Sequence, residues 1–405
     1  MLPYGRQTIE DDDIAAVAEV LRGDFLTTGP MVEAFETAFA DTVGARHAVA
    51  CANGTAALHL AYRALGLETG DAVVVPANTF LATASAARLA GAEVVFADVD
   101  PDTGLMGPEQ AEAAIGRAQA VGWRVRVLAP VHFAGQCADM DGLDALAQRH
   151  GLSVVEDACH ALGGTIRRGR ADRPVGSGAG TVPSLTVFSF HPVKTVAAGE
   201  GGAVTTGDVQ LDARLRALRN HGMTRDPAGF ADREAAFAPD GTLNPWYYEM
   251  PEPSLNDRLT DIQSALALSQ MRRLDAFVTR RRWLMDLYAA RFAALTPPLA
   301  ALVRPLARVP WCAPAWHLAV VLIDFASAGR DRASVMAALR ARGIGSQVHY
   351  IPVHHQPYWR NRHGDLALPG ADAYYARALS LPLFPAMADG DVDRVVDALE
   401  EALTG

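Results

Sequence analysis

One lysine lies where a nucleophile is expected. Lys194 follows the apolar segment 185–190 and precedes the glycine-rich residues 199–202. A lysine removed from bulk water has a lowered pKa, so its amine is neutral often enough to attack a carbonyl carbon. A loop lysine is ordinarily exposed, but this small-residue setting after an apolar strand favours a Schiff-base lysine.

A carboxylate and a histidine follow another predicted strand. Asp157 ends the apolar run that starts at Leu152, and His160 lies three residues later. Burying a carboxylate is costly without a partner, and a protonated pyridine nitrogen would be a suitable one. The alternatives are a capping acid in a strand-to-helix loop and a loop histidine with an ordinary hydrogen-bond partner.

A third motif is suited to phosphate. Gly54 and Thr55 come between a short apolar strand, 47–51, and a predicted helix. A strand, a glycine turn and a helix N-terminus present free backbone N–H groups to an anion, and Thr55 adds a hydroxyl. An ordinary helix cap formed by Asn53 is the alternative. The chain has no GxxxxGK[ST] phosphate loop.

Hydrophobic patterning predicts the elements that position these groups. Amphipathic helices are expected at 11–22 and 31–43, and apolar strands then alternate with helices up to residue 206. Such alternation indicates an α/β fold with a mostly parallel sheet covered on both faces, which binds ligands at the carboxyl ends of its strands. The predicted strands are 47–51, 73–75, 93–99, 124–131, 152–158, 185–190 and 201–206.

The second part of the chain has a different organisation. Residues 224–256 are irregular, and a long helical stretch, 259–295, follows. A proline-rich link then leads to a smaller C-terminal unit with strands at 316–324 and 346–350 and a helix at 332–343.

Composition limits the function classes. The net charge is −10 without basic runs, which argues against a nucleic-acid partner. Four cysteines without CxxC spacing favour a reducing, cytoplasmic compartment. The N-terminus does not resemble a signal peptide, and no segment is typical of a membrane span. Histidines at 349, 354 and 355 do not form an HExxH motif or another ligand pattern, so no metal is expected.

Together these motifs resemble one family, the fold-type-I, pyridoxal-phosphate-dependent sugar aminotransferases of the DegT/StrS kind. The resemblance extends from about residue 8 to the end, and its pieces include ANGTAALHL, EDACHALGG, FSFHPVKTVAAGEGG, LNDRLTDIQSALALSQM and VHYIPVH. It implies a large cofactor-binding domain, 1–255, with an N-terminal helical segment and a mostly parallel seven-stranded sheet between helices. Residues 256–405 are expected to form the long helix and a smaller C-terminal α/β domain. Within the family the chain looks closest to the pseudaminic acid branch.

The resemblance also implies a role for each matching residue. Lys194 would bind the cofactor covalently and transfer a proton, and Asp157 would keep the pyridine nitrogen protonated. The other expected cofactor contacts are Phe80 on the ring face, His160 at the phenolic oxygen, Gly54, Thr55 and Ser189 at the phosphate, and Asn256 reaching the phosphate of the neighbouring subunit. The expected substrate contacts are Arg258, His349 and Tyr350.

The implied reaction transfers an amino group, with L-glutamate as the expected donor, to C4 of a 4-keto-6-deoxy sugar on UDP, in a homodimer with shared sites. Two departures from the family pattern leave the substrate open: residues 254–258 read SLNDR in place of G-Y-N-x-R, and His160 replaces the usual glutamine. The alternatives are a dTDP- or GDP-linked sugar, a cyclitol or amino-hydroxybenzoate precursor, a sugar dehydratase and a catalytically idle sensor. A dehydratase of this family would have histidine in place of Lys194.

Overall fold

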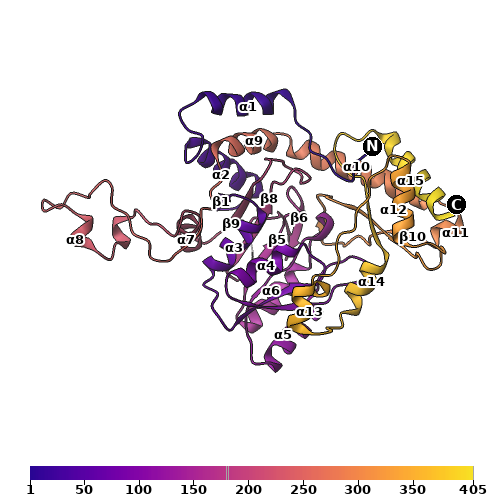
Figure 1. The fold of residues 1–405 in the computed structure, drawn as a ribbon, viewed down its shortest axis with the longest axis horizontal. Coiled ribbons are helices and arrows are strands. Elements are labelled where there is room, and N and C mark those ends of the chain that lie inside the picture. Colours follow the sequence, from indigo (N-terminus) through magenta and orange to yellow (C-terminus); the bar gives the residue numbers. More distant parts are fainter. Residues whose placement is uncertain (179, 181, 405) are drawn as a thin grey trace.

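A central sheet organises the large part of the molecule (Figure 1). The computed structural model describes residues 1–178, 180 and 182–404. The sheet has seven strands in the order β1-β9-β8-β5-β4-β2-β3. Strand β9 is antiparallel to β1 and β8, and the other pairs are parallel, so the predicted sheet is confirmed. The strands are β1 (His47–Cys51), β2 (Asp71–Pro76), β3 (Glu93–Ala97), β4 (Arg124–Leu128), β5 (Ser153–Asp157), β8 (Ser184–Ser189) and β9 (Gly202–Thr206).

The sheet is apolar because helices cover it. Strands β2 and β9 are buried at every position, as expected for a sheet with both faces covered. Local signals begin and end the helices: Asp139 caps α6 by accepting the N–H of Gly142, and Gly151 ends that helix in the left-handed conformation. The helices of this unit are α3 (Gly54–Ala64), α4 (Leu81–Leu89), α5 (Pro108–Ala120), α6 (Met140–His150) and α7 (Val209–Arg219).

The long helical stretch expected at 259–295 is two helices, α9 (Asp261–Met271) and α10 (Leu274–Ala293). The break falls at Arg272 and Arg273. Arg273 has non-helical dihedral angles and its guanidinium pairs with acidic groups at the start of α1 (Asp11–Arg22), including Asp12 at 2.6 Å. Helix α9 packs against α1 and α2 (Pro30–Val43), as Figure 1 shows.

The C-terminal unit has its own hydrophobic core. A three-stranded sheet, β10 (Val303–Pro305), β12 (Ala319–Ile323) and β13 (Ala378–Leu381), packs with α12 (Arg332–Ala341), α15 (Asp389–Thr404) and the second half of α10. Helix α9 contributes to the core of the large unit instead. The boundary between residues 255 and 256 stays a prediction.

The strand predicted at 346–350 is wrong. Within this segment one residue, Gln347, makes a bridge, to Ser380. The chain then leaves the small sheet, because the N–H of Tyr350 bonds to the Asn78 side chain of the large unit at 3.2 Å. The segment therefore connects the two units and carries His349 and Tyr350 to the face of the large sheet.

Short elements complete the chain: β6 (Thr165–Arg168), β7 (Ala171–Pro174), β11 (Cys312–Ala313), α8 (Arg233–Ala236), α11 (Pro297–Ala300), α13 (Pro357–His363) and α14 (Pro369–Arg377). The segment that carries α8 protrudes from the rest of the molecule (Figure 1). Among the helices of the described residues, none is both long and apolar enough to cross a bilayer.

Candidate active site

A cavity of about 860 Å³ opens at the carboxyl ends of the parallel strands, beside the segment that connects the two units. Its size is in the range of small-molecule sites. Nine of the eleven predicted site residues line it: Gly54, Thr55, Phe80, Asp157, His160, Ser189, Lys194, His349 and Tyr350. The sheet topology explains the convergence, because Asp157 ends β5 and Ser189 ends the neighbouring parallel strand β8.

Lys194 carries the ε-amine of this cavity. It is the chain's single lysine, so every other cationic side chain is an arginine or a protonated histidine. The turn after β8 holds it, with its N–H bonded to the carbonyl of His191 at 2.8 Å. Burial lowers the pKa of Lys194, and the nearby Cys159 and Asp157 partly oppose that shift. A larger fraction of Lys194 is therefore in the neutral amine form, which attacks a carbonyl carbon, than for a lysine in water.

Asp157 is a buried carboxylate held in a fixed orientation. Thr83 of α4 donates its hydroxyl to one oxygen at 2.8 Å, and the backbone N–H of Cys159 donates to the other at 3.2 Å. The side chain lines the cavity and is 5% exposed. It is thus placed to accept a hydrogen bond from a cationic ring nitrogen within the cavity.

Two neutral imidazoles lie together near Lys194. Tyr350 bonds to His160 through its hydroxyl and Nε2, at 3.2 Å, while His160 Nδ1 is buried without a hydrogen-bond partner among the described residues. The His160 ring lies 4.4 Å from that of His317. Burial lowers the pKa of both histidines well below the ordinary value, and Lys194 lowers each further. His160 Nδ1 is thus a polar atom available to a ligand.

The start of α3 is shaped for an anion. Asn53 caps the helix by accepting the N–H of Ala56 at 2.9 Å, as the alternative interpretation expected. Capping leaves other first-turn N–H groups free, so it is compatible with anion binding. A Cβ at Gly54 would lie 2.9 Å from the Ser189 Cβ, so the absence of a side chain keeps backbone and hydroxyl close together.

We expect Gly54→Ala to weaken binding of the cofactor phosphate. The added methyl group would force the α3 turn away from Ser189. Loss of one hydrogen bond to the charged phosphate costs about 1.5–3 kcal/mol, or roughly 10- to 150-fold in affinity. Titration of the cofactor into apoprotein measures the effect. Gly116→Ala, where a Cβ meets open space on α5, is the matched control and should bind as wild type does. Equal affinity of the two variants would contradict the assigned anion site.

His349, Tyr350 and Phe80 form the outer wall. His349 Nδ1 lies 2.8 Å from the Ser380 hydroxyl, and burial lowers its pKa to about 3. The Phe80 ring lies 6.0 Å from the Tyr350 ring and is 55% exposed. An exposed aromatic ring at the mouth of a cavity is suited to stacking on a planar ligand.

Asn256 and Arg258 do not line this cavity. Asn256 is exposed, and the Arg258 guanidinium bonds to the Asn220 side chain. Arg258 lines a second cavity, of about 550 Å³, together with Arg216 and Arg219. Within one chain, therefore, the structure separates these two predicted residues from Lys194.

Sequence reasoning missed several residues of the site. Thr83 orients Asp157, His317 packs on His160, and Tyr4 from the N-terminal segment lines the cavity. Thr83 lies in α4, whereas Thr79 precedes that helix, and their hydroxyls are 2.8 Å apart. No sequence motif marked Thr83 as a partner of Asp157. His317 was a polar residue in an apolar run, which we interpreted as a strand.

The residues of the cavity fit pyridoxal phosphate. An amine for its aldehyde, a carboxylate for its ring nitrogen and a helix N-terminus with two hydroxyls for its phosphate all face one space. His160 Nδ1, which has no hydrogen-bond partner in the part of the chain that the structure describes, adds a polar atom for the cofactor's oxygen.

Comparisons with known proteins agree with this chemistry. Residues 7–400 match the DegT/DnrJ/EryC1/StrS aminotransferase family. The chain is 39% identical, over 100% of its length and 97% of the relative's, to the spore coat polysaccharide biosynthesis protein SpsC of Bacillus subtilis.

Two solved structures have the same fold. Helicobacter pylori PseC, an aminotransferase of pseudaminic acid biosynthesis, is 25% identical with a TM-score of 0.84, covering 99% of both chains. The putative sugar aminotransferase Spr1654 of Streptococcus pneumoniae, in its PMP form, is 27% identical with a TM-score of 0.86, covering 100% of this chain and 99% of that one. Spr1654 is also known in a PLP form, so the fold accommodates both states of the cofactor.

Proposed function

Because the chain belongs to the DegT/DnrJ/EryC1/StrS aminotransferase family, we propose that it transfers an amino group from L-glutamate to C4 of a nucleotide-linked 4-keto-6-deoxy sugar. The observation that carries the proposal is the placement of Lys194, Asp157 and His160 around one cavity. A lysine at position 194 also opposes the dehydratase alternative, which would have histidine there.

Each of the cavity residues has a separate role in the proposed reaction. Pyridoxal phosphate, when bound, supplies the electron sink that stabilises negative charge at the substrate carbon. Lys194 holds the cofactor and, when its amine is free, carries a proton to and from the reacting carbon. Asp157 keeps a proton at the ring nitrogen, and Thr83 keeps Asp157 in position. His160, neutral because of its burial, donates or accepts a hydrogen bond without adding charge.

For the substrate we propose UDP-2-acetamido-2,6-dideoxy-β-L-arabino-hexos-4-ulose. The support is the similarity to PseC, an aminotransferase of pseudaminic acid biosynthesis, and a cavity of about 860 Å³ around Lys194. The similarity to SpsC is compatible with a product used in a cell-surface polysaccharide. Other solved structures of this fold are described as sugar aminotransferases with no sugar specified, so the nucleotide and the sugar must be tested together.

A substrate panel tests the proposal. Holoenzyme is incubated with L-glutamate and UDP-, dTDP- or GDP-linked 4-keto-6-deoxy sugars, and release of 2-oxoglutarate and formation of the amino sugar are followed. The UDP-linked N-acetyl sugar is expected to have the highest kcat/KM. A preference for a dTDP- or GDP-linked sugar, or for a cyclitol ketone, would reject the substrate and retain the aminotransferase. Cofactor binding without turnover of any ketone would favour the sensor.

A homodimer with shared sites is also part of the proposal. The protruding segment exposes large apolar side chains, including Trp246 at 70% and Met250 at 56%, which a lone chain leaves in water. Asn256, at the base of this segment and outside its own chain's cavity, is free to reach the phosphate of a partner. Sedimentation equilibrium should give the mass of two chains, and a monomeric holoenzyme with full activity would reject shared sites.

A cytoplasmic location completes the proposal. All four cysteines are free thiols, which is the usual state in a reducing compartment. Fractionation of cells that produce the protein checks the location, and recovery outside the cytoplasmic fraction would reject it.

A further inference from the structure

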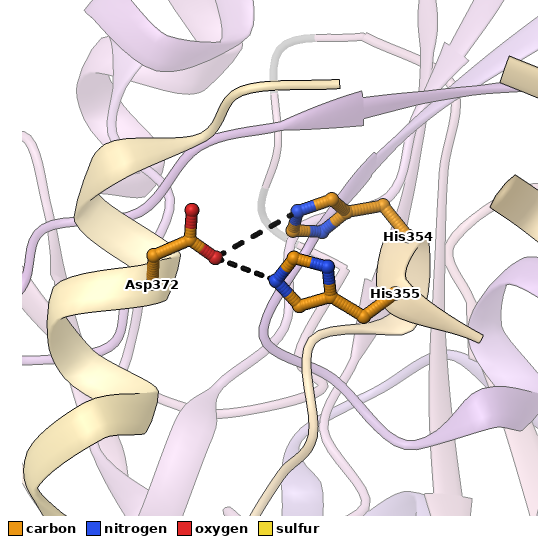
Figure 2. Close-up of side chains that lie close together, drawn as sticks. All are labelled: His354, His355 and Asp372. Carbon is orange, nitrogen blue, oxygen red and sulfur yellow. Dashed lines mark hydrogen bonds and ion pairs between the residues drawn. The ribbon is translucent and has the colours of Figure 1, made fainter. Parts of the chain in front are cut away.

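Two histidines and an aspartate face one another outside the Lys194 cavity. His354 and His355 are adjacent in a short 3₁₀ turn, 353–355, and Asp372 lies in the first turn of α14. Figure 2 shows both imidazole rings facing the Asp372 carboxylate. The three potential ligand atoms lie within 4.8 Å of one another. Because 17 residues separate Asp372 from His355, no short sequence motif revealed the group.

His354 is the unusual member of this group. It is 3% exposed, and neither of its ring nitrogens has a hydrogen-bond partner among the described residues. Its Nε2 lies 3.9 Å from the Asp372 oxygen, which is too long for a hydrogen bond. Leaving a buried polar group unsatisfied costs about 1–3 kcal/mol, so a missing ligand is a physical explanation for this arrangement.

We propose that His354 Nε2, His355 Nε2 and Asp372 Oδ1 bind one Zn²⁺ ion, with the fourth position open to water. Zinc binds imidazole nitrogen and carboxylate oxygen at about 2.0–2.2 Å, so two ligands of one tetrahedral ion lie roughly 3.3 Å apart. The observed separations of Asp372 Oδ1 from the two nitrogens, 2.6 and 3.9 Å, lie on either side of that value. Shifts of less than about 1 Å would bring these two separations to that value, and the two imidazole nitrogens, within 4.8 Å of each other, would close by about 1.5 Å at most.

The surrounding charges both favour and oppose the ion. Asp98 adds negative charge close to His354, while Arg360 opposes a cation because its guanidinium lies 3.4 Å from His355 Nδ1. The side chains of His355 and Asp372 are 28% and 47% exposed, which gives the ion a path from solvent.

Zinc titration of the holoenzyme, freed of excess cofactor, tests the site. Zn²⁺ is divided between the protein and a chromophoric chelator, and Co²⁺ is used in parallel so that its visible absorption reports the coordination. Wild type is expected to bind one ion per chain at this site. Asp372→Asn should weaken that binding more than about 100-fold, because loss of an outer-shell partner alone costs 10–100-fold. Arg360→Gln should tighten it.

Two further variants, His150→Ala and His354→Ala, are compared with wild type and Asp372→Asn in the same titration. His150→Ala removes another histidine that is paired with a carboxylate, at 2.9 Å from Glu112, and should leave zinc affinity unchanged. His354→Ala should behave like Asp372→Asn; if it fails to fold, the exposed Asp372 variant still decides. Wild-type affinity no tighter than that of Asp372→Asn, or an equal loss in His150→Ala, would overturn the proposal. Aminotransferase activity is measured separately, so either inference can fail alone.

Discussion

Lys194→Ala is expected to abolish transamination. The substitution removes both the group that holds the cofactor and the base that moves the proton, and proton transfer alone contributes about 10²–10⁴-fold to a rate. We therefore expect kcat to fall by at least about 10⁴-fold. Steady-state release of 2-oxoglutarate with glutamate and the preferred keto sugar measures the loss.

The composition of the chain makes a second readout unusually specific. Since Lys194 is the single lysine, borohydride reduction of the holoenzyme has one ε-amine to fix, and the N-terminal amine is the one other primary amine of the polypeptide chain. Peptide mass analysis should locate the cofactor on residues 188–206 in wild type and nowhere on that segment in Lys194→Ala. Lys194→Arg preserves the charge and tests whether a cation suffices. Turnover near wild type in either variant would reject the assignment.

The sequence predicted the site residues that follow the strands of the large sheet, because the strands are recognisable locally and the sheet topology then fixes where their ends lie. Asp157 and Ser189 end buried strands, and Gly54 begins a helix after one. In a parallel sheet these ends lie at one edge, so strand prediction alone brings them together. Lys194 follows by the same argument. This argument covers the seven cavity residues between positions 54 and 194. His349 and Tyr350 reach the cavity through the segment that connects the two units, where the predicted strand was wrong.

The remaining features depend on contacts between distant segments. His317 lies beside His160 because the backbone N–H of His317 bonds to the carbonyl of Ala134. Ala134 has a positive φ and forms a turn that the sequence pattern did not predict. The proximity of Asp372 to His355 depends on how α14 packs on the large unit. The expected strand at 346–350 had suitable residues but lacked a neighbour along its length. Asn256 and Arg258 lie outside the Lys194 cavity of their own chain, so the expected contact of Asn256 with a neighbouring subunit and that of Arg258 with the substrate stay predictions.

Asp157→Asn is expected to reduce kcat by roughly 100- to 1,000-fold, the usual consequence of removing one preorganised electrostatic partner in an active site. Asparagine keeps the size of the side chain and can still accept the Cys159 N–H, so the local fold should persist. Its amide has no charge with which to hold a proton at the cofactor's ring nitrogen. Cofactor affinity should also fall, and the absorption of the bound cofactor should titrate at lower pH.

Glu156→Gln is the matched control, because adjacent residues of a strand point to opposite faces of the sheet. Glu156 is as buried as Asp157 but pairs with His132 at 3.0 Å and Arg168 at 2.7 Å, away from the cavity. Its substitution should lower the free energy of unfolding, because a buried ion pair is weakened, and leave the cofactor spectrum unchanged. If both variants lost stability but neither altered the spectrum, Asp157 would be a structural carboxylate. A spectral and kinetic change confined to Asp157→Asn would establish that this carboxylate acts on the ring nitrogen.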